Sequence, residues 1–62
     1  MQVTPAAIEA VEQQVTEVRA RTGCTRPAVI TRHGRAPRLG FHFREGAKVG
    51  DVIDGARVLK IV

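Results

Sequence analysis

The segment TPAAIEAVEQQVTEVRARTG, residues 4–23, decides the fold because it carries the clearest helix signature in the chain. Thr4 is a residue type that caps helix N-termini, Pro5 suits the first helical position, and Gly23 is a natural stop. Apolar side chains recur three and four residues apart, at Ile8, Val11, Val15 and Val18. This spacing predicts an amphipathic helix whose apolar stripe must be buried against another element.

The residues after the helix change to the periodicity of β-strands. The segment 28–33 is a short run rich in β-branched residues, and the segment 38–45 alternates between polar and apolar side chains. Leu39, Phe41 and Phe43 share one face of this second segment, so we expect them to pack against the helix.

The C-terminal part of the chain predicts a further hairpin, residues 49–62. Asp54-Gly55 is a dipeptide favoured in type I′ turns. The segment 56–62 is apolar on both faces except for Arg57 and Lys60, which indicates an interior strand or one that pairs with another chain. We therefore predict a single α+β domain over residues 1–62, with one N-terminal helix packed on a three- to four-stranded antiparallel sheet in the order αβββ.

Charge is distributed unevenly along the chain. The segment 19–48 contains eight basic side chains and one acid, Glu45, and so carries a formal charge of +7, whereas the whole chain of 62 residues carries +4. Such an asymmetry favours an anionic partner. The candidate binding residues of this basic stretch are Arg26, Arg32, Arg35, Arg38, His42 and Arg44.

Several of these basic residues are expected to lie on one sheet face. Alternation predicts that Arg32, Arg38, His42 and Arg44 line the face opposite the phenylalanines, with Arg35 at the hairpin tip. Guanidinium groups on an exposed sheet face suit phosphate oxygens, so nucleic-acid binding is one functional hypothesis. The segment 40–43 resembles the aromatic strand of RNA-recognition domains, in which rings stack on bases. Because Leu39 shares the face of both rings, burial of the rings against the helix is the favoured interpretation.

Protein docking is the other hypothesis, and the composition favours it. The chain has two Phe, no Trp and no Tyr, so its core must come from smaller aliphatic side chains. A domain of this size buries only about 60% of its unfolded surface, which makes a protein partner or a homo-oligomer a reasonable expectation. The expected contact residues are Val58, Leu59 and Ile61. The leading hypothesis is a small protein-interaction module that docks on itself or on a larger assembly, for example as a virion accessory subunit or an inhibitor of a host protein.

Chemistry-bearing residues are few and do not form a catalytic motif. His33 and His42 flank the predicted hairpin, but two histidines without a suitably spaced cysteine or acid are a weak metal signal. Cys24 is alone, which excludes an intrachain disulfide. We expect no enzyme activity, no cofactor and no metal. Without a basic leader or an apolar run of about 18 residues, the chain is expected to be soluble, without membrane contact, and cytoplasmic in a bacterium or an infected host cell.

Overall fold

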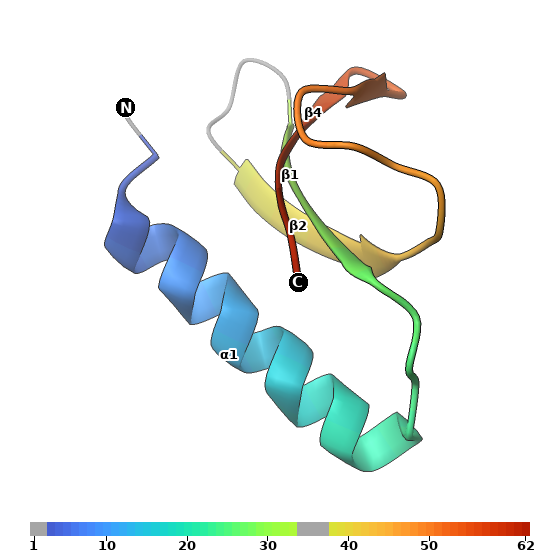
Figure 1. Ribbon diagram of the computed structural model, residues 1–62. Helices are drawn as coiled ribbons and strands as arrows, with labels where there is room; N and C mark the ends of the chain where they lie inside the picture. The colour runs from blue at the N-terminus through green and yellow to red at the C-terminus, as the bar shows by residue number, and fades with distance from the viewer. Residues whose placement is uncertain (1–2, 34–37) are drawn as a thin grey trace.

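The structure is a computed structural model that describes residues 3–33 and 38–62. The helix is followed by four strands that form one antiparallel sheet (Figure 1). The elements are α1 (Pro5–Thr22), β1 (Ala28–His33), β2 (Arg38–Phe43), β3 (Val52–Ile53) and β4 (Ala56–Ile61). The predicted α+β architecture is confirmed.

The ends of α1 follow the local signals in the sequence. The Thr4 side chain accepts a hydrogen bond from the Ala7 N–H at 3.2 Å, and Pro5 occupies the first helical turn. Gly23 adopts a left-handed conformation with φ of 69°, and its N–H donates to the Arg19 carbonyl at 2.8 Å. These caps satisfy backbone groups that a helix end otherwise leaves without partners.

The sheet order is β2-β1-β4-β3, so β1 and β4 are interior strands and β2 and β3 are edges. The chain therefore crosses from one edge to the other between β2 and β3. The pairing of β1 with β4 shifts by one residue between Ile30 and Thr31, because Ile30 lies opposite Lys60 while Thr31 lies opposite Val58. Leu59 is the extra residue of this bulge, and such an insertion increases the local twist of a strand.

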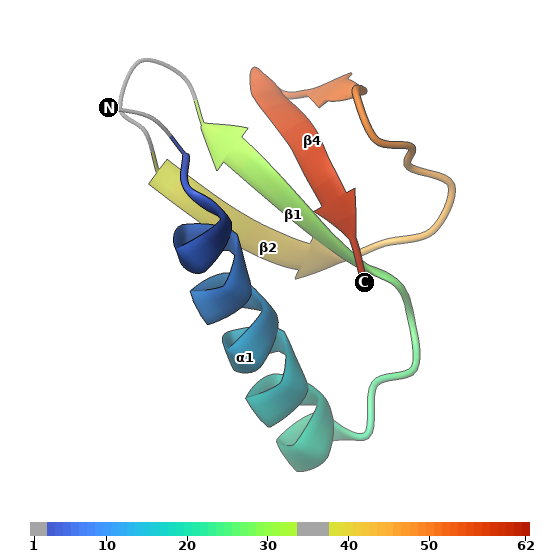
Figure 2. The same ribbon diagram turned by 60° about the vertical axis from the view of Figure 1, so that its left-hand side comes forward.

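The helix covers one half of one sheet face. Ile30 lies opposite Phe41 and Ala28 lies opposite Phe43, which places both rings on the same face as Ile30. The Phe43 ring has the Arg19 guanidinium 5.7 Å from its centroid, so this is the face that carries α1. Figure 2 shows α1 beside β2 and β1 and away from the β4–β3 hairpin. The expected packing of the phenylalanines toward the helix is confirmed.

The core consists of small aliphatic side chains, as the composition requires. The buried hydrophobic residues are Val11, Val15, Ala28, Val29, Ile30, Ala56 and Val58. The two phenylalanine rings are half-buried at the border of this core and meet edge to face, with centroids 5.9 Å apart. Ala28 and Ile30 lie on the helix face, whereas Val29, Ala56 and Val58 lie on the opposite face, so buried aliphatic side chains occur on both faces of the sheet.

Polar contacts join the helix to the sheet at two places. Arg19 Nη2 donates to the main-chain oxygens of Arg26 at 3.0 Å and Val62 at 2.7 Å. Two turns closer to the N-terminus of the helix, Glu12 forms an ion pair with Lys60 of β4. Arg19 therefore connects three separate parts of the chain: the end of α1, the segment before β1 and the residue after β4.

The turn between β3 and β4 has the conformation expected from its sequence. Asp54 and Gly55 have φ angles of 50° and 78°. Positive φ at both central residues is characteristic of a type I′ turn, and this combination is why Asp-Gly is favoured there.

Candidate binding site

The register of β1 with β2 divides the predicted basic face into two groups. Arg32 lies opposite Leu39, on the same face as the phenylalanines and the helix. Arg38 lies opposite His33, and His42 lies opposite Val29, so both occupy the other face, called here the outer face. The expectation that Arg32 shares a face with Arg38 and His42 is wrong. The reason is that side chains alternate along β1. Ala28 and Ile30 lie on the helix side, and Arg32, two residues after Ile30, lies on the same side.

Arg44 joins the outer face. It directly follows β2, and its N–H donates to the Pro27 carbonyl at 3.1 Å, so the β1–β2 pairing extends one residue beyond the assigned strands. By alternation its side chain lies on the side of His42. Arg38, His42 and Arg44 are all exposed. They form a line of basic side chains along the edge strand, called here the outer basic row.

The remaining predicted basic residues do not belong to this row. Arg26 is exposed in the segment between α1 and β1, where its carbonyl oxygen is held by Arg19. Arg35 lies outside the described residues.

The edge of β2 that faces away from β1 offers unpaired backbone groups. Alternate residues of an antiparallel strand direct their backbone groups to opposite sides. Because the Arg44 N–H donates to Pro27, next to β1, the even-numbered residues of β2 direct their backbone groups inward, toward β1. The backbone N–H and C=O groups of Ala28 both bond to Val62, at 3.0 and 2.9 Å, and therefore point away from β2. Phe43, which lies opposite Ala28, consequently has no backbone hydrogen-bond partner in β1. The N–H and C=O groups of Leu39, Phe41 and Phe43 therefore point outward.

No hydrogen bond joins these outward groups to another part of the chain that the structure describes. Buried backbone groups without partners are rare in folded proteins, so these groups must be hydrated when no partner is bound. The edge strand is six residues long, and within it there is neither a proline nor a bulge. Prolines, bulges and very short length are common devices that prevent a strand edge from pairing with another chain.

A histidine and a glycine shape the outer face next to this edge. His33 Nε2 lies 3.0 Å from the Oγ1 atom of Thr31, whose side chain is fully buried. A Cβ atom at Gly40 would lie 3.2 Å from the same nitrogen, so the imidazole occupies the space that the glycine leaves open. The sequence pattern did not reveal this role, because Gly40 alone is indistinguishable from any other polar-face residue of an alternating strand. Glycine within a strand, however, often marks such a close approach.

The predicted contact residues of β4 are less accessible than expected. Val58, which was predicted to contact a partner, is only 1% exposed and belongs to the core. β4 lies between β1 and β3, and Val58 is paired with Thr31, which is also fully buried. Leu59 and Ile61 are half-buried. The large apolar side chains that are exposed are Val49, Val52 and Val62.

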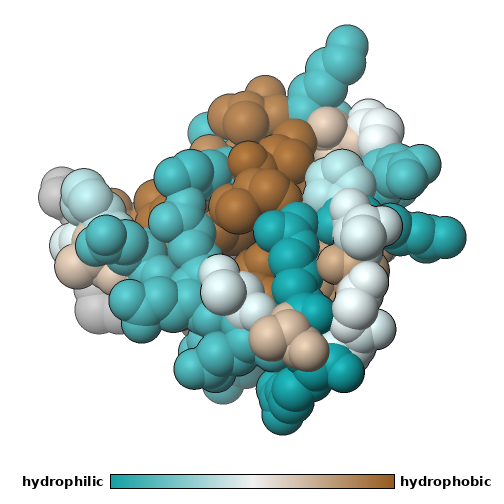
Figure 3. Space-filling model, turned by 60° about the horizontal axis from the view of Figure 1, so that its bottom comes forward, coloured by the Kyte–Doolittle hydropathy of each residue, from teal (hydrophilic) through white to brown (hydrophobic). Residues whose placement is uncertain are grey.

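Apolar side chains nevertheless reach the surface. Figure 3 shows them gathered between hydrophilic residues on the face that it displays. Apolar surface bordered by polar residues is a common feature of protein contact sites.

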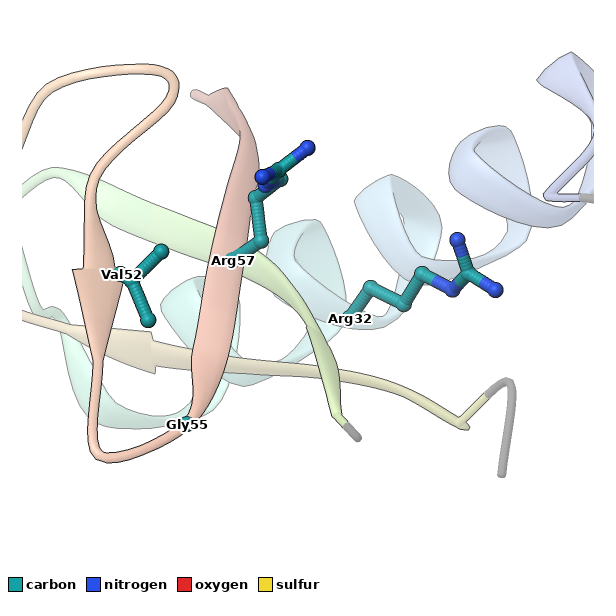
Figure 4. A pocket seen from close by; sticks show the side chains of 4 residues that line it. All are labelled: Arg32, Val52, Gly55 and Arg57. Atoms are coloured by element: carbon teal, nitrogen blue, oxygen red, sulfur yellow. The ribbon is translucent and has the colours of Figure 1, made fainter. Parts of the chain in front are cut away.

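A second basic group lies on the helix side of the sheet. Arg32 of β1 is paired directly with Arg57 of β4, and Arg57 is paired with Val52 of β3. These three residues and Gly55 line an open hollow of about 320 Å³ (Figure 4). The backbone of α1 lies close to β1 and β2 and not to β4 or β3, and Glu12 reaches β4 at Lys60, which leaves the part of the face around Arg57 and Val52 uncovered.

Other site types have little support among the described residues. Within 3–33 and 38–62, no three His, Cys, Asp or Glu side chains are close enough to hold a metal ion. The single helix in this part of the chain lacks the length and apolar character needed to cross a membrane. Comparison of the chain with protein families, curated proteins and solved structures finds no significant match.

Proposed function

We propose that this protein is a small non-enzymatic interaction module that binds an acidic, extended segment of a partner protein along the free edge of β2. The observation that carries the proposal is the combination of outward backbone groups at Leu39, Phe41 and Phe43 with the outer basic row. Backbone hydrogen bonds supply affinity in such strand addition, and the alternating side chains supply specificity.

The pattern of the partner follows from the alternation of β2. A strand added to this edge places every second side chain on the outer face, beside Arg38 and His42. Opposite charges on neighbouring strands contribute roughly 0.2–1 kcal/mol per pair. The intervening side chains of the partner lie on the helix side, next to the half-buried Leu39, Phe41 and Phe43. The complementary segment therefore alternates acidic and apolar residues.

The charges disfavour a second copy of the same strand as the occupant. Antiparallel pairing of two β2 strands would bring Arg38 of one copy close to His42 or Arg44 of the other. Like charges directly opposite each other are destabilising. The same charges attract carboxylates, so an acidic partner is favoured.

The arrangement of the arginines also favours protein over nucleic acid. A nucleic-acid strand needs a continuous basic surface that follows its phosphates and, for single strands, aromatic rings on which bases stack. Here the basic side chains divide between two faces, and the two phenylalanines pack beneath the helix, with Arg19 over the ring of Phe43. Nucleic-acid binding becomes the alternative outcome of the test below.

The test measures binding of a fluorescein-labelled peptide with the repeat Glu-Val by fluorescence anisotropy. The comparison peptide has the same number of glutamates but a proline in place of each valine, which removes every second N–H donor. We expect the first peptide to bind at least tenfold more tightly than the second. A duplex and a single-stranded oligonucleotide of matched charge are measured at two salt concentrations.

Two double variants with the same change in net charge separate the site from general electrostatics. Arg38→Glu with Arg44→Glu reverses two charges of the outer basic row, while Arg21→Glu with Lys48→Glu reverses two exposed charges elsewhere. The first pair should lose peptide binding and the second should retain most of it. Equal affinity of both peptides, or equal loss in both variants, would overturn strand addition. Oligonucleotide binding that exceeds peptide binding and falls steeply with salt would support the nucleic-acid hypothesis instead.

A further inference from the structure

The pair formed by Arg32 and Arg57 is unusual because two like charges occupy directly paired positions of neighbouring strands. Side chains at such positions have Cβ atoms roughly 5 Å apart, and like charges there are destabilising. Among the described residues, neither guanidinium has a carboxylate within 4.0 Å; the ion pair found there joins Lys60 to Glu12 instead. The repulsion is therefore not relieved by the described part of the protein itself.

The surroundings of the two arginines form a recess in the surface. The register places both side chains on the same side of the sheet. In Figure 4 their guanidinium groups point apart, so a ligand bound by both requires a change of side-chain rotamer; Val52 lies on the strand beyond Arg57 and Gly55 lies in the adjoining turn. Val52 is 63% exposed, so it offers an apolar surface beside the charges. The helix contacts β1 and β2 and leaves this region open.

The chemistry of the recess selects a small anion with an organic part. Each guanidinium offers a planar fork of N–H donors that matches the oxygens of phosphate, and a doubly charged group can satisfy two guanidinium groups at once. The volume of about 320 Å³ lies at the lower end of the range of small-molecule sites and exceeds what a phosphate ion alone fills.

We propose that Arg32 and Arg57 bind the phosphate group of a small phosphate monoester, whose organic part contacts Val52. This site is distinct from the edge of β2, and it does not depend on binding of an acidic peptide there. Binding of the dianion removes the repulsion between the arginines, so the ligand also stabilises the fold.

The experiment titrates the protein with phenyl phosphate, inorganic phosphate and phenol at constant ionic strength while backbone amide signals are recorded by NMR. We expect phenyl phosphate to shift the amides of Val52, Gly55 and Arg57, to bind at least threefold more tightly than inorganic phosphate, and to raise the melting temperature. Phenol should produce no saturable shift. Inorganic phosphate that binds as tightly as phenyl phosphate would exclude the monoester and reduce the site to one for free phosphate.

Arginine variants test whether phenyl phosphate binds at Arg32 and Arg57. Arg57→Ala and Arg32→Ala should each weaken phenyl phosphate binding at least tenfold, whereas Arg38→Ala on the outer face should change it less than twofold. Removal of either arginine relieves the repulsion, so without ligand these variants should melt at the same or a higher temperature than the unmodified protein. Unchanged affinity in the Arg57→Ala and Arg32→Ala variants, or shifts spread over the outer basic row, would overturn the site.

The two proposals can fail separately. If the site at Arg32 and Arg57 is wrong but strand addition is right, phenyl phosphate binding is absent while the Glu-Val peptide still binds. If strand addition alone is wrong, the peptide result fails while the amides of Val52 and Gly55 still respond to phenyl phosphate.

Discussion

Replacement of Arg19 by alanine should destabilise the fold more than its position near the end of a surface helix suggests. The guanidinium donates to the main-chain oxygens of Arg26 and Val62 at 3.0 and 2.7 Å and lies 5.7 Å from the centroid of the Phe43 ring. Arg19→Ala removes all three contacts at once. It thereby separates the helix from both the entry to β1 and the end of β4.

The expected cost is about 2 kcal/mol. Hydrogen bonds from charged groups contribute roughly 1.5–3 kcal/mol when well protected, but these oxygens can be hydrated after the change, so about 0.5–1 kcal/mol per bond is appropriate. The cation–π contact adds about 0.5–1 kcal/mol at a partly exposed site. For a domain of this size, 1 kcal/mol corresponds to roughly 4–8 °C in melting temperature, so the expected decrease is roughly 10 °C.

The assay is thermal and urea unfolding followed by circular dichroism, with two comparison variants. Arg19→Lys keeps the charge but lacks the planar fork that reaches two oxygens, so it should recover no more than about half of the lost stability. Arg21→Ala removes an exposed arginine from the same last turn and should cost less than about 0.5 kcal/mol. Equal melting temperatures for Arg19→Ala and Arg21→Ala would refute the role of Arg19 as a connector.

Three further predictions test the packing. Val15→Ala should cost about 2 kcal/mol because Val15 is fully buried, whereas Val49→Ala, at a residue 65% exposed, should change the urea midpoint very little. Gly40→Val should destabilise the protein by about 1 kcal/mol because overpacking against the imidazole outweighs the better strand propensity of valine. In a His33→Ala background the same change should become neutral or stabilising, and a double-mutant cycle from urea unfolding would detect this; additive effects would contradict the contact. Gly55→Ala should cost about 1 kcal/mol because Gly55 has φ of 78°, and an unchanged unfolding free energy would exclude strain at this turn.

Local sequence signals predicted the elements well because each is determined by neighbouring residues. Thr4, Gly23 and the Asp54-Gly55 pair act through their own backbone conformations and hydrogen bonds, and the structure places each where the pattern indicates. The alternation in residues 38–43 correctly assigned the phenylalanines to the helix side. These features need no knowledge of which strand lies beside which.

The features that the sequence could not predict depend on strand order and register. Arg32 and Arg38 both occupy even-numbered positions, so alternation alone assigns them to one row when the strand register is not known. The actual pairing of Arg32 with Leu39 separates them. Likewise, the partner of Arg32 is Arg57, which lies 25 positions further along the chain. No local periodicity connects these two residues, because their proximity results from the placement of β4 between β1 and β3.

The incomplete coverage of the sheet by the helix leaves one candidate surface available, and the position of β2 at the end of the strand order leaves the other. One helix of 18 residues lies against β1 and β2, so the helix side of β4 and β3 stays open around Arg57 and Val52. The outer edge of β2 stays unpaired because no other described strand follows it in the sheet. In a larger α+β domain, additional helices or strands commonly cover such regions, and the positions would then become part of the core. Under the two proposals, the charged pair on the uncovered half-face and the basic row along the free edge would keep these surfaces hydrated in the isolated protein and would restrict binding to anionic partners. The two proposals therefore assign the same charges two roles, which are to prevent nonspecific association and to select the ligand of each surface.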